Sequence, residues 1–336
     1  MAISPTGPLT LTDIQTEFGG SNPISLSEYY AGGSFVQVGA TGDNGAIPSS
    51  GQIEMSKFFG AASVIPMEFL VIAGGGGGGM GAGLGGGGGA GGMRTSTESN
   101  VAPGTVITVT VGAGGGSTDS RFLVGTNGLN SSISSPGITN LSTVGGGRGG
   151  SQDVFTPDHG GALGGGSGGG GSTANPGPAS GGTGTSGEGN AGGQGGRPAT
   201  PTGIYGGGGG GKGSAGQSGT VPAQGTGGAG EASPVTGTPV FYASGGAGGP
   251  GGAQPGGGGN NGAPGQNGQA YFGGGGGGGN NDGSDPASVS GAGGTGVVIM
   301  NVPTSKYTGT TTGSPDISVS GPLTIIKFTG SGSYTA

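Results

Sequence analysis

The chain has 336 residues, and 102 of them are glycine, whereas hydrophobic residues make up only 28%. This composition excludes a large apolar core for most of the chain, and the absence of cysteine excludes disulfides and thiolate sites. Charged residues are 7% of the total and the formal net charge is -7, which excludes charge-driven disorder and the basic surface that nucleic-acid binding requires.

Residues 1–62 are poorer in glycine and contain a repeated pattern. The segment Ile24–Tyr30 (ISLSEYY) is echoed by Ile53–Phe59 (IEMSKFF), and a weaker copy spans Leu9–Ile14. Each copy offers a leucine or methionine, a serine or threonine, a charge and then apolar or aromatic residues. We interpret each copy as a short strand that enters a helix of one or two turns.

Capping-box patterns at Thr12–Gln15 and Ser25–Glu28 predict where the first two helices begin, and the pairs Gly19-Gly20 and Gly32-Gly33 predict where they end. Helices this short are stable only when packed, so we predict that residues 1–62 are a docking or assembly module, which folds against a partner or against copies of the chain. The alternative is a small self-contained domain. The residues expected at the docking contacts are Ile14, Leu26, Tyr29, Tyr30, Met55, Phe58 and Phe59.

Four segments rich in β-branched and aromatic residues predict β-strands: 67–73, Val106–Val111, Gly296–Val302 and Pro322–Thr329. The last two return from far along the sequence, so we predict that all four form one small sheet that fixes both ends of the glycine-rich region. Residues 63–302 would then be a glycine-rich domain bracketed by strands, and residues 303–336 a C-terminal β segment that completes the sheet.

Between these strands, glycine runs such as Gly74–Gly79 and Gly206–Gly211 alternate with Gly-Gly-X stretches such as Gly245–Ala253. A repeat of three matches the polyproline II helix, which turns once every ~3 residues and has no internal hydrogen bonds. Without Cβ atoms, neighbouring helices approach closely enough for N–H to meet C=O. We therefore predict a mostly irregular fold with short N-terminal helices, a small β-sheet and a glycine-rich array of packed polyproline II helices. Flexible linkers are the alternative.

Polar connectors rich in turn residues separate the glycine runs, and we expect them to gather at two ends of the array, one of which faces away from residues 1–62. The connectors are Ser117–Asn130, Ser151–His159, Ser172–Ser180, Arg197–Pro201, Thr220–Gln224, Glu231–Ser244 and Asn280–Ser290. Aromatic residues at or near them are candidates for receptor contact, because aromatic rings stack on sugars and anchor interfaces. These candidates are Phe155, Tyr205, Phe241, Tyr242, Tyr271 and Phe272. The alternative is that they plug the ends of the array.

No pattern of catalytic or metal-binding residues stands out. The run Gly206–Gly211 followed by Lys212 lacks the serine or threonine that a phosphate loop has directly after its lysine. The single histidine, His159, with Asp153 and Asp158 is a poor ligand set for a transition metal. We predict no enzyme activity, no cofactor and no metal.

Three motifs carry a family resemblance. The segment Met67–Gly74 leading into polyglycine, the segment Pro103–Gly115 and the segment Gly293–Ile299 resemble, in this order, the glycine-rich domain of bacteriophage tail-fibre and virion proteins. The glycine array also resembles the tip adhesins of T-even-type long tail fibres, and residues 1–62 resemble N-terminal modules of cyanophage virion proteins, in motifs such as Leu26–Tyr30. The resemblance implies a phage structural protein that contacts the host.

We therefore expect a tail-fibre or tip adhesin that docks on other virion proteins through residues 1–62 and presents its connectors to a host glycan or outer-membrane protein. The alternative is a subunit of a self-assembling glycine-rich filament, extracellular or attached to the virion. An ice-binding protein is a third reading, which the mixed X positions disfavour. The start of the sequence has no secretory signal pattern, and no apolar run approaches ~18 residues. We expect a virion or extracellular location, reached without a signal peptide and without membrane insertion.

Overall fold

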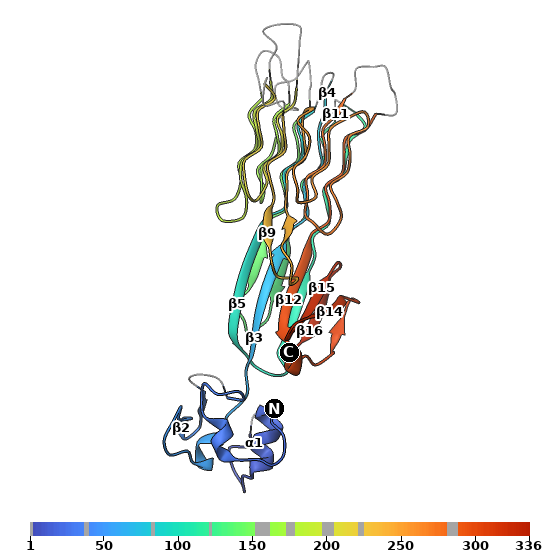
Figure 1. Cartoon of the computed structure of the whole chain (residues 1–336). Helices are drawn as coiled ribbons and strands as arrows, with labels where there is room; N and C mark the ends of the chain where they lie inside the picture. The colour runs from blue at the N-terminus through green and yellow to red at the C-terminus, as the bar shows by residue number, and fades with distance from the viewer. Residues whose placement is uncertain are drawn as a thin grey trace.

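The computed structural model describes residues 3–36, 40–81, 85–120, 123–151, 162–172, 179–196, 205–220, 225–280 and 288–336. Along its long axis the molecule has three regions: the N-terminal module at one end, a β-sandwich in the middle and the glycine-rich region at the other end (Figure 1). The described part is mostly irregular, with one short α-helix and several small antiparallel sheets.

The module contains α1 (Leu11–Phe18), the 3-10 helices η1 (Leu26–Tyr29) and η2 (Met55–Phe58), and the short paired strands β1 (Thr41–Gly42) and β2 (Gly45–Ala46). Helix α1 begins after Thr10, whose hydroxyl accepts a hydrogen bond from the Asp13 N–H while the Asp13 carboxylate accepts one from the Thr10 N–H. The capping box therefore starts at Thr10, earlier than the predicted Thr12.

The two clear copies of the sequence repeat form equivalent 3-10 helices. Tyr29 and Phe58 occupy the same position in the repeat, both are fully buried, and their rings meet edge to face with centroids 6.3 Å apart. A strand was predicted before each of these helices, but among the described residues Ile24 and Ile53 belong to no strand. The buried cluster of the module consists of Ile3, Ile14, Phe18, Tyr29, Ala31, Val36, Ala40, Ile47, Phe58 and Ala61.

The sandwich has two five-stranded sheets in which all neighbouring strands are antiparallel. The first sheet has the order β14 (Asp316–Ser320), β15 (Leu323–Phe328), β12 (Val297–Pro303), β3 (Ile65–Ile72) and β5 (Met93–Val101). The second has the order β13 (Thr311–Thr312), β16 (Gly332–Thr335), β6 (Val106–Thr110), β7 (Ser131–Ser134) and β8 (Leu141–Thr143). The 3-10 helix η3 (Thr304–Lys306) follows β12.

The prediction of a single sheet is wrong. Strands form at all four predicted positions, but β6 pairs with β16 and β7 in the second sheet, whereas β3, β12 and β15 pair in the first. Two sheets are needed because the strands carry apolar residues on one shared face, which is buried only when another sheet covers it.

The core between the sheets follows from the alternation of side chains along each strand. Phe69 and Val71 of β3 pack with Met300 of β12 and with Ile107 and Tyr334 from the second sheet. The opposite face of β3 carries Leu70 and Ile72, which are covered by the hairpin of β9 (Glu231–Ser233) and β10 (Val240–Tyr242).

The described glycine runs contact their neighbours with a period of three. A Cβ atom added to Gly74 or Gly77 would lie 2.0–2.1 Å from the carbonyl oxygen of residue 113 or 116. Cβ atoms on Gly75 and Gly78 would meet the carbonyl oxygens of residues 274 and 277. Cβ atoms on Gly76 and Gly79 would meet those of residues 147 and 150. Each run therefore presents three edges, and each edge lies against a different neighbour.

Backbone hydrogen bonds link the runs with the same period. The N–H groups of residues 74 and 77 donate to the carbonyls of residues 129 and 126. The N–H groups of residues 75 and 78 donate to the carbonyls of 294 and 291, and the N–H groups of residues 76 and 79 donate to the carbonyls of 89 and 86. All six distances are 2.8–3.0 Å. The short parallel pair β4 (Met80–Gly81) and β11 (Gly279–Asn280) lies at the end of the region farthest from the module (Figure 1).

Candidate functional site

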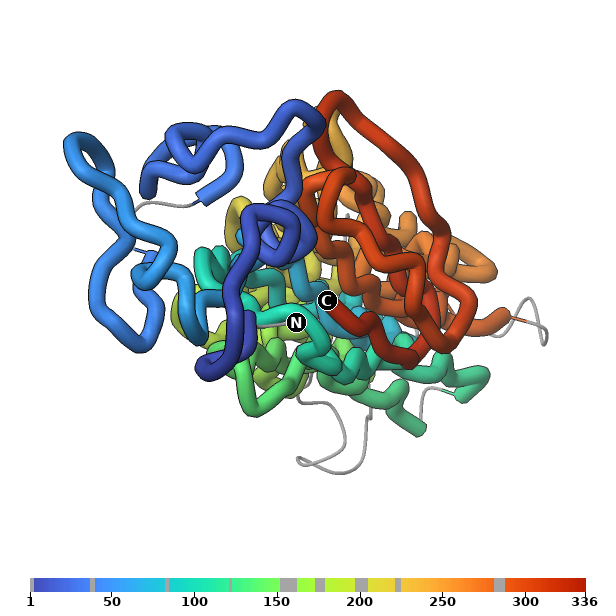
Figure 2. The backbone as a smooth tube through the Cα atoms, turned by 90° about the horizontal axis from the view of Figure 1, so that it is seen from below, coloured from blue at the N-terminus to red at the C-terminus, as the bar shows by residue number. Residues whose placement is uncertain are grey.

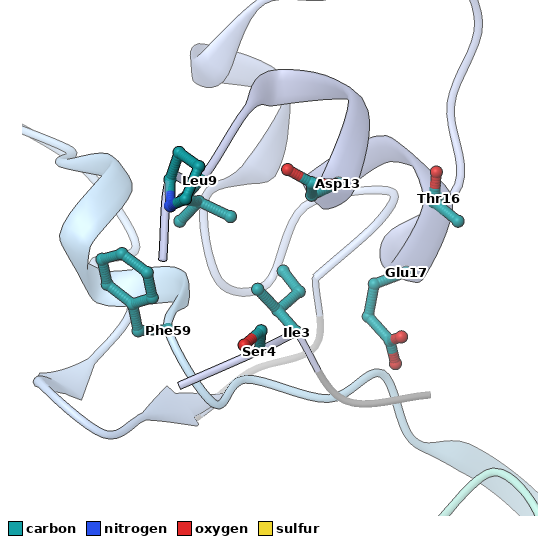
Figure 3. A pocket seen from close by; sticks show the side chains of 8 residues that line it. Ile3, Ser4, Leu9, Asp13, Thr16, Glu17 and Phe59 are labelled. Atoms are coloured by element: carbon teal, nitrogen blue, oxygen red, sulfur yellow. The ribbon is translucent and has the colours of Figure 1, made fainter. Parts of the chain in front are cut away.

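The N-terminal module contains a pocket of about 310 Å³ beside α1 (Figure 3). Its apolar lining consists of Ile3, Pro8, Leu9 and Phe59, and its polar lining of Ser4, Asp13, Thr16 and Glu17. The chain before α1, one face of the helix and the residue that follows η2 therefore meet around one cavity.

Helix α1 gives the pocket its polar side. Ile14 and Phe18 turn into the module core, which leaves Asp13, Thr16 and Glu17 toward the pocket. The Glu17 carboxylate accepts hydrogen bonds from the N–H (2.9 Å) and the hydroxyl (3.3 Å) of Ser63. Because Ser63 lies two residues before β3, this contact ties the pocket to the segment that joins the module to the sandwich.

The pocket is acidic. Hydrogen bonds from the hydroxyl and the N–H of Thr10 hold the pKa of the Asp13 carboxyl below its ordinary value, so Asp13 is charged at neutral pH. The lining residues include no lysine, arginine or histidine to offset Asp13 and Glu17. In sequence, residues 1–62 contain five carboxylates (Asp13, Glu17, Glu28, Asp43 and Glu54) and one basic side chain (Lys57), which gives five minus one, a net charge of -4. The module is therefore negatively charged as a whole, in keeping with the acidic lining of its pocket.

The predicted docking residues fall into two groups. Ile14, Tyr29 and Phe58 are fully buried and hold the module together, so their side chains present no surface to a partner. The others are half-buried: Leu26, Tyr30, Met55 and Phe59. Of these, Phe59 lines the pocket. Sequence reasoning missed Ile3 and Pro8, and the only signal for the pocket was the pair of acids one turn apart on α1.

Four of the aromatic candidates gather where the glycine-rich region meets the sandwich. Tyr242 is only 4% exposed, and its ring packs against Phe272 with centroids 5.4 Å apart. Burial raises the pKa of the Tyr242 phenol. Phe241 and Tyr271 are 48% and 41% exposed, and the Lys327 Nζ lies 5.8 Å from the centre of the Tyr271 ring. Tyr242 and Phe272 therefore belong to the packing of the junction, whereas Phe241 and Tyr271 keep exposed rings.

The remaining two candidates are elsewhere. The Tyr205 carbonyl accepts a hydrogen bond from the Gly196 N–H, and the Tyr205 side chain is half-buried. Phe155 lies outside the described residues, as do His159, Asp153 and Asp158. Within the described ranges, no group of histidine, aspartate and glutamate side chains is arranged to hold a metal ion.

The residues that flank most connectors lie together at the end of the glycine-rich region farthest from the module. Hydrogen bonds join Ser290 N–H to the Thr118 carbonyl, Gly196 N–H to the Tyr205 carbonyl, and Met80 N–H to the Ser151 hydroxyl. Met80 is in β4, which marks this far end (Figure 1). The connector Glu231–Ser244 is different, because it forms the β9–β10 hairpin on the sandwich.

Lys212, which follows the glycine run 206–211, donates a hydrogen bond from its Nζ to the Gly187 carbonyl at 2.9 Å. Among the helices in the described ranges, none is long and apolar enough to cross a membrane.

Comparison with known proteins gives one family. No curated protein matches the chain. The model of the family described as the glycine-rich domain matches residues 57–303, which is most of the chain and includes the first sheet apart from β14 and β15. The chain therefore belongs to the glycine-rich domain family.

Proposed function

We propose that the chain is a bacteriophage virion protein, a tail-fibre or tip adhesin that docks through residues 1–62 and presents its connectors to the host surface. The observation that carries this proposal is that the two ends of the long axis differ. The module with its pocket lies at one end, and the described residues that flank most of the connectors lie at the other (Figure 1). A fibre tip needs this separation, because one end must hold the particle while the other meets the host.

The glycine runs are, in this proposal, polyproline II helices packed side by side. The contacts with a period of three support it, because a polyproline II helix turns once every ~3 residues and leaves its N–H and C=O groups free for neighbours. An array of this kind is a stiff spacer that holds the connectors away from the docking module. The host ligand would be a surface glycan or an outer-membrane protein.

Immunogold electron microscopy of the lysate or culture that yields the protein tests the proposal. We expect gold at the ends of tail fibres. Gold along free filaments, with none on particles, would instead establish the alternative, a subunit of a self-assembling filament. Adsorption that survives deletion of the far-end connectors would refute the adhesin role even if the protein is in the virion.

The docking step has its own matched pair of variants. Phe59 and Tyr30 occupy equivalent positions of the repeat and both are half-buried, but only Phe59 lines the pocket. We expect Phe59→Ser to reduce incorporation into particles by about tenfold, because an apolar anchor is lost from the pocket. In this proposal docking takes place at the pocket, so Tyr30, which the sequence predicted as a docking contact, lies outside the contact and Tyr30→Ser should leave incorporation unchanged. Equal loss in both variants would show that the pocket is not the docking site.

A further inference from the structure

Strand β14 is an exposed edge of the first sheet with apolar side chains in solvent. Ile317 is 43% exposed and Val319 is 64% exposed. Ile317 lies opposite Ile326, a residue of the core between the sheets, so Ile317 and Val319 lie on the core-facing side of the sheet. They stay uncovered because the second sheet ends at β13, which has 2 residues. The C-terminal segment that contains β14 lies on the outside of the molecule in both views (Figures 1 and 2).

We propose that β14 pairs edge to edge with β14 of a second copy of the chain. An edge strand presents a row of N–H and C=O groups that form a sheet with any suitable strand. In the described part of the chain, β14 pairs with β15 alone, so its other side is open. The strand itself has no lysine, arginine or proline, and its one charge, Asp316, is at its first position after Pro315, so Ile317–Ser320 has none of the residues that proteins place on edges to prevent pairing.

The other outer strands of the sandwich are protected. Strand β5 carries Arg94 and Glu98, and its register with β3 is irregular between Ile65 and Met67. Strand β8 has 3 residues and β13 has 2, which are too few for a stable intermolecular ladder. Among the described outer strands of the sandwich, β14 alone combines five residues with exposed apolar side chains.

The sequence of β14 (DISVS) fits a second copy of itself. A symmetric pair of identical edge strands is antiparallel and has a two-fold axis through its centre. With the axis at Ser318, all five residues pair: Ile317 faces Val319 of the second copy, and Asp316 faces Ser320 of the second copy. Apolar side chains then cover each other and no two carboxylates are opposite. The pairing occupies the β14 edge of each copy, so the assembly closes as a dimer.

Because the chain has no cysteine, single cysteines can report the register. In the two-fold pair, position 318 faces itself, and directly opposed strand residues have Cβ atoms about 4.5–5.5 Å apart, close to the separation that a disulfide spans. We expect Ser318→Cys to form covalent dimers under mild oxidation of the full-length chain. Ser320→Cys, the matched control on the same strand, should stay monomeric on a non-reducing gel. Cross-linking of both variants to the same extent, or of neither, overturns the proposal.

Sedimentation equilibrium of the unmodified chain gives an independent measurement. We expect a monomer–dimer equilibrium that Val319→Lys weakens by at least about tenfold, because a lysine on the edge blocks pairing. The matched control is Val106→Lys, which places the same charge at a valine that is 52% exposed on β6, a strand with neighbours on both sides. A wild-type chain that is monomeric throughout, or a dimer that Val319→Lys does not weaken, overturns the proposal. Neither result bears on the proposed virion role, which rests on the module and the far end.

Discussion

At the scale of single residues, glycine in this protein is a packing requirement. A Cβ atom on Gly88 would lie 2.1 Å from the Gly76 carbonyl oxygen, well inside any real contact. Gly88 also donates to the Gly276 carbonyl (2.8 Å) and accepts from the Gly246 N–H (2.9 Å). Three different runs therefore fix its backbone, and none can retreat without breaking hydrogen bonds to further runs.

We predict that Gly88→Ala destabilises the glycine-rich region by about 1–3 kcal/mol or more, the usual cost of overpacking. Gly330→Ala is the control, because a Cβ atom at Gly330 meets nothing within 4 Å. Thermal unfolding followed by circular dichroism should show a lower midpoint for the first variant and an unchanged or slightly higher one for the second. Equal midpoints would mean that the runs are not packed as described.

At the scale of secondary-structure elements, the cap of α1 shows how far the sequence specifies local structure. The capping-box pattern at Thr12–Gln15 predicts the helix, but the capping box that forms begins two residues earlier, at Thr10. Tertiary packing sets where the first turn of a helix begins, and the residue at that point then becomes the cap. Here the helix is positioned by Ile14 and Phe18, which face the core of the module.

We predict that Thr10→Ala raises the pKa of Asp13 toward its ordinary value, because the hydroxyl hydrogen bond that lowers it is lost. A lowered folded-state pKa contributes stability that is present above the unfolded-state pKa and is lost as pH falls through the folded-state value. The variant should therefore be less stable at neutral pH and show a weaker loss on acidification. Carboxyl titration by NMR measures the pKa, and the exposed Thr12 gives the control, Thr12→Ala, which should leave it unchanged.

The strands show which part of the fold the sequence does not specify. Strands rich in valine and isoleucine, such as β3, β6 and β12, are predictable from composition, but their partners are not, because pairing depends on distant segments. Strand β5 escaped prediction since its sequence, from Met93 to Val101, is mostly serine, threonine and charged residues. Strand β7 (SSIS) was not predicted either, because it has only four residues and three of them are serine.

At the scale of the whole molecule, the pocket could not be predicted, because it is assembled from three separate segments. Ile3 and Leu9 come from the chain before α1, Glu17 from the helix and Phe59 from the residue after η2. Their sequence separation leaves no periodic signal. That residues 1–62 are a separate module stays a prediction of the sequence; in the structure, their buried cluster shares no residue with those of the sandwich.

Separate cores predict separate unfolding. Phe58→Ala leaves a cavity in the module and should destabilise it by about 3–5 kcal/mol, while the transition of the sandwich stays where it is. Phe69→Ala, at a position equally buried between the two sheets, should shift only the transition of the sandwich. Differential scanning calorimetry of the full chain measures both. A single transition that moves by the same amount in both variants would contradict independent cores.

The last prediction concerns whether a region so rich in glycine is ordered at all. Flexible glycine linkers leave their amides to water, whereas here every N–H group from Gly74 to Gly79 donates to a carbonyl of another segment at 2.8–3.0 Å. Opening one run requires the surrounding runs to separate, so we expect its amides to exchange as slowly as those of β3 in the sandwich. Hydrogen exchange by NMR on a glycine-labelled chain measures this. Exchange of the Gly74–Gly79 amides at the rate of an unfolded peptide would contradict the packed arrangement, because no network of backbone hydrogen bonds could then persist across the region.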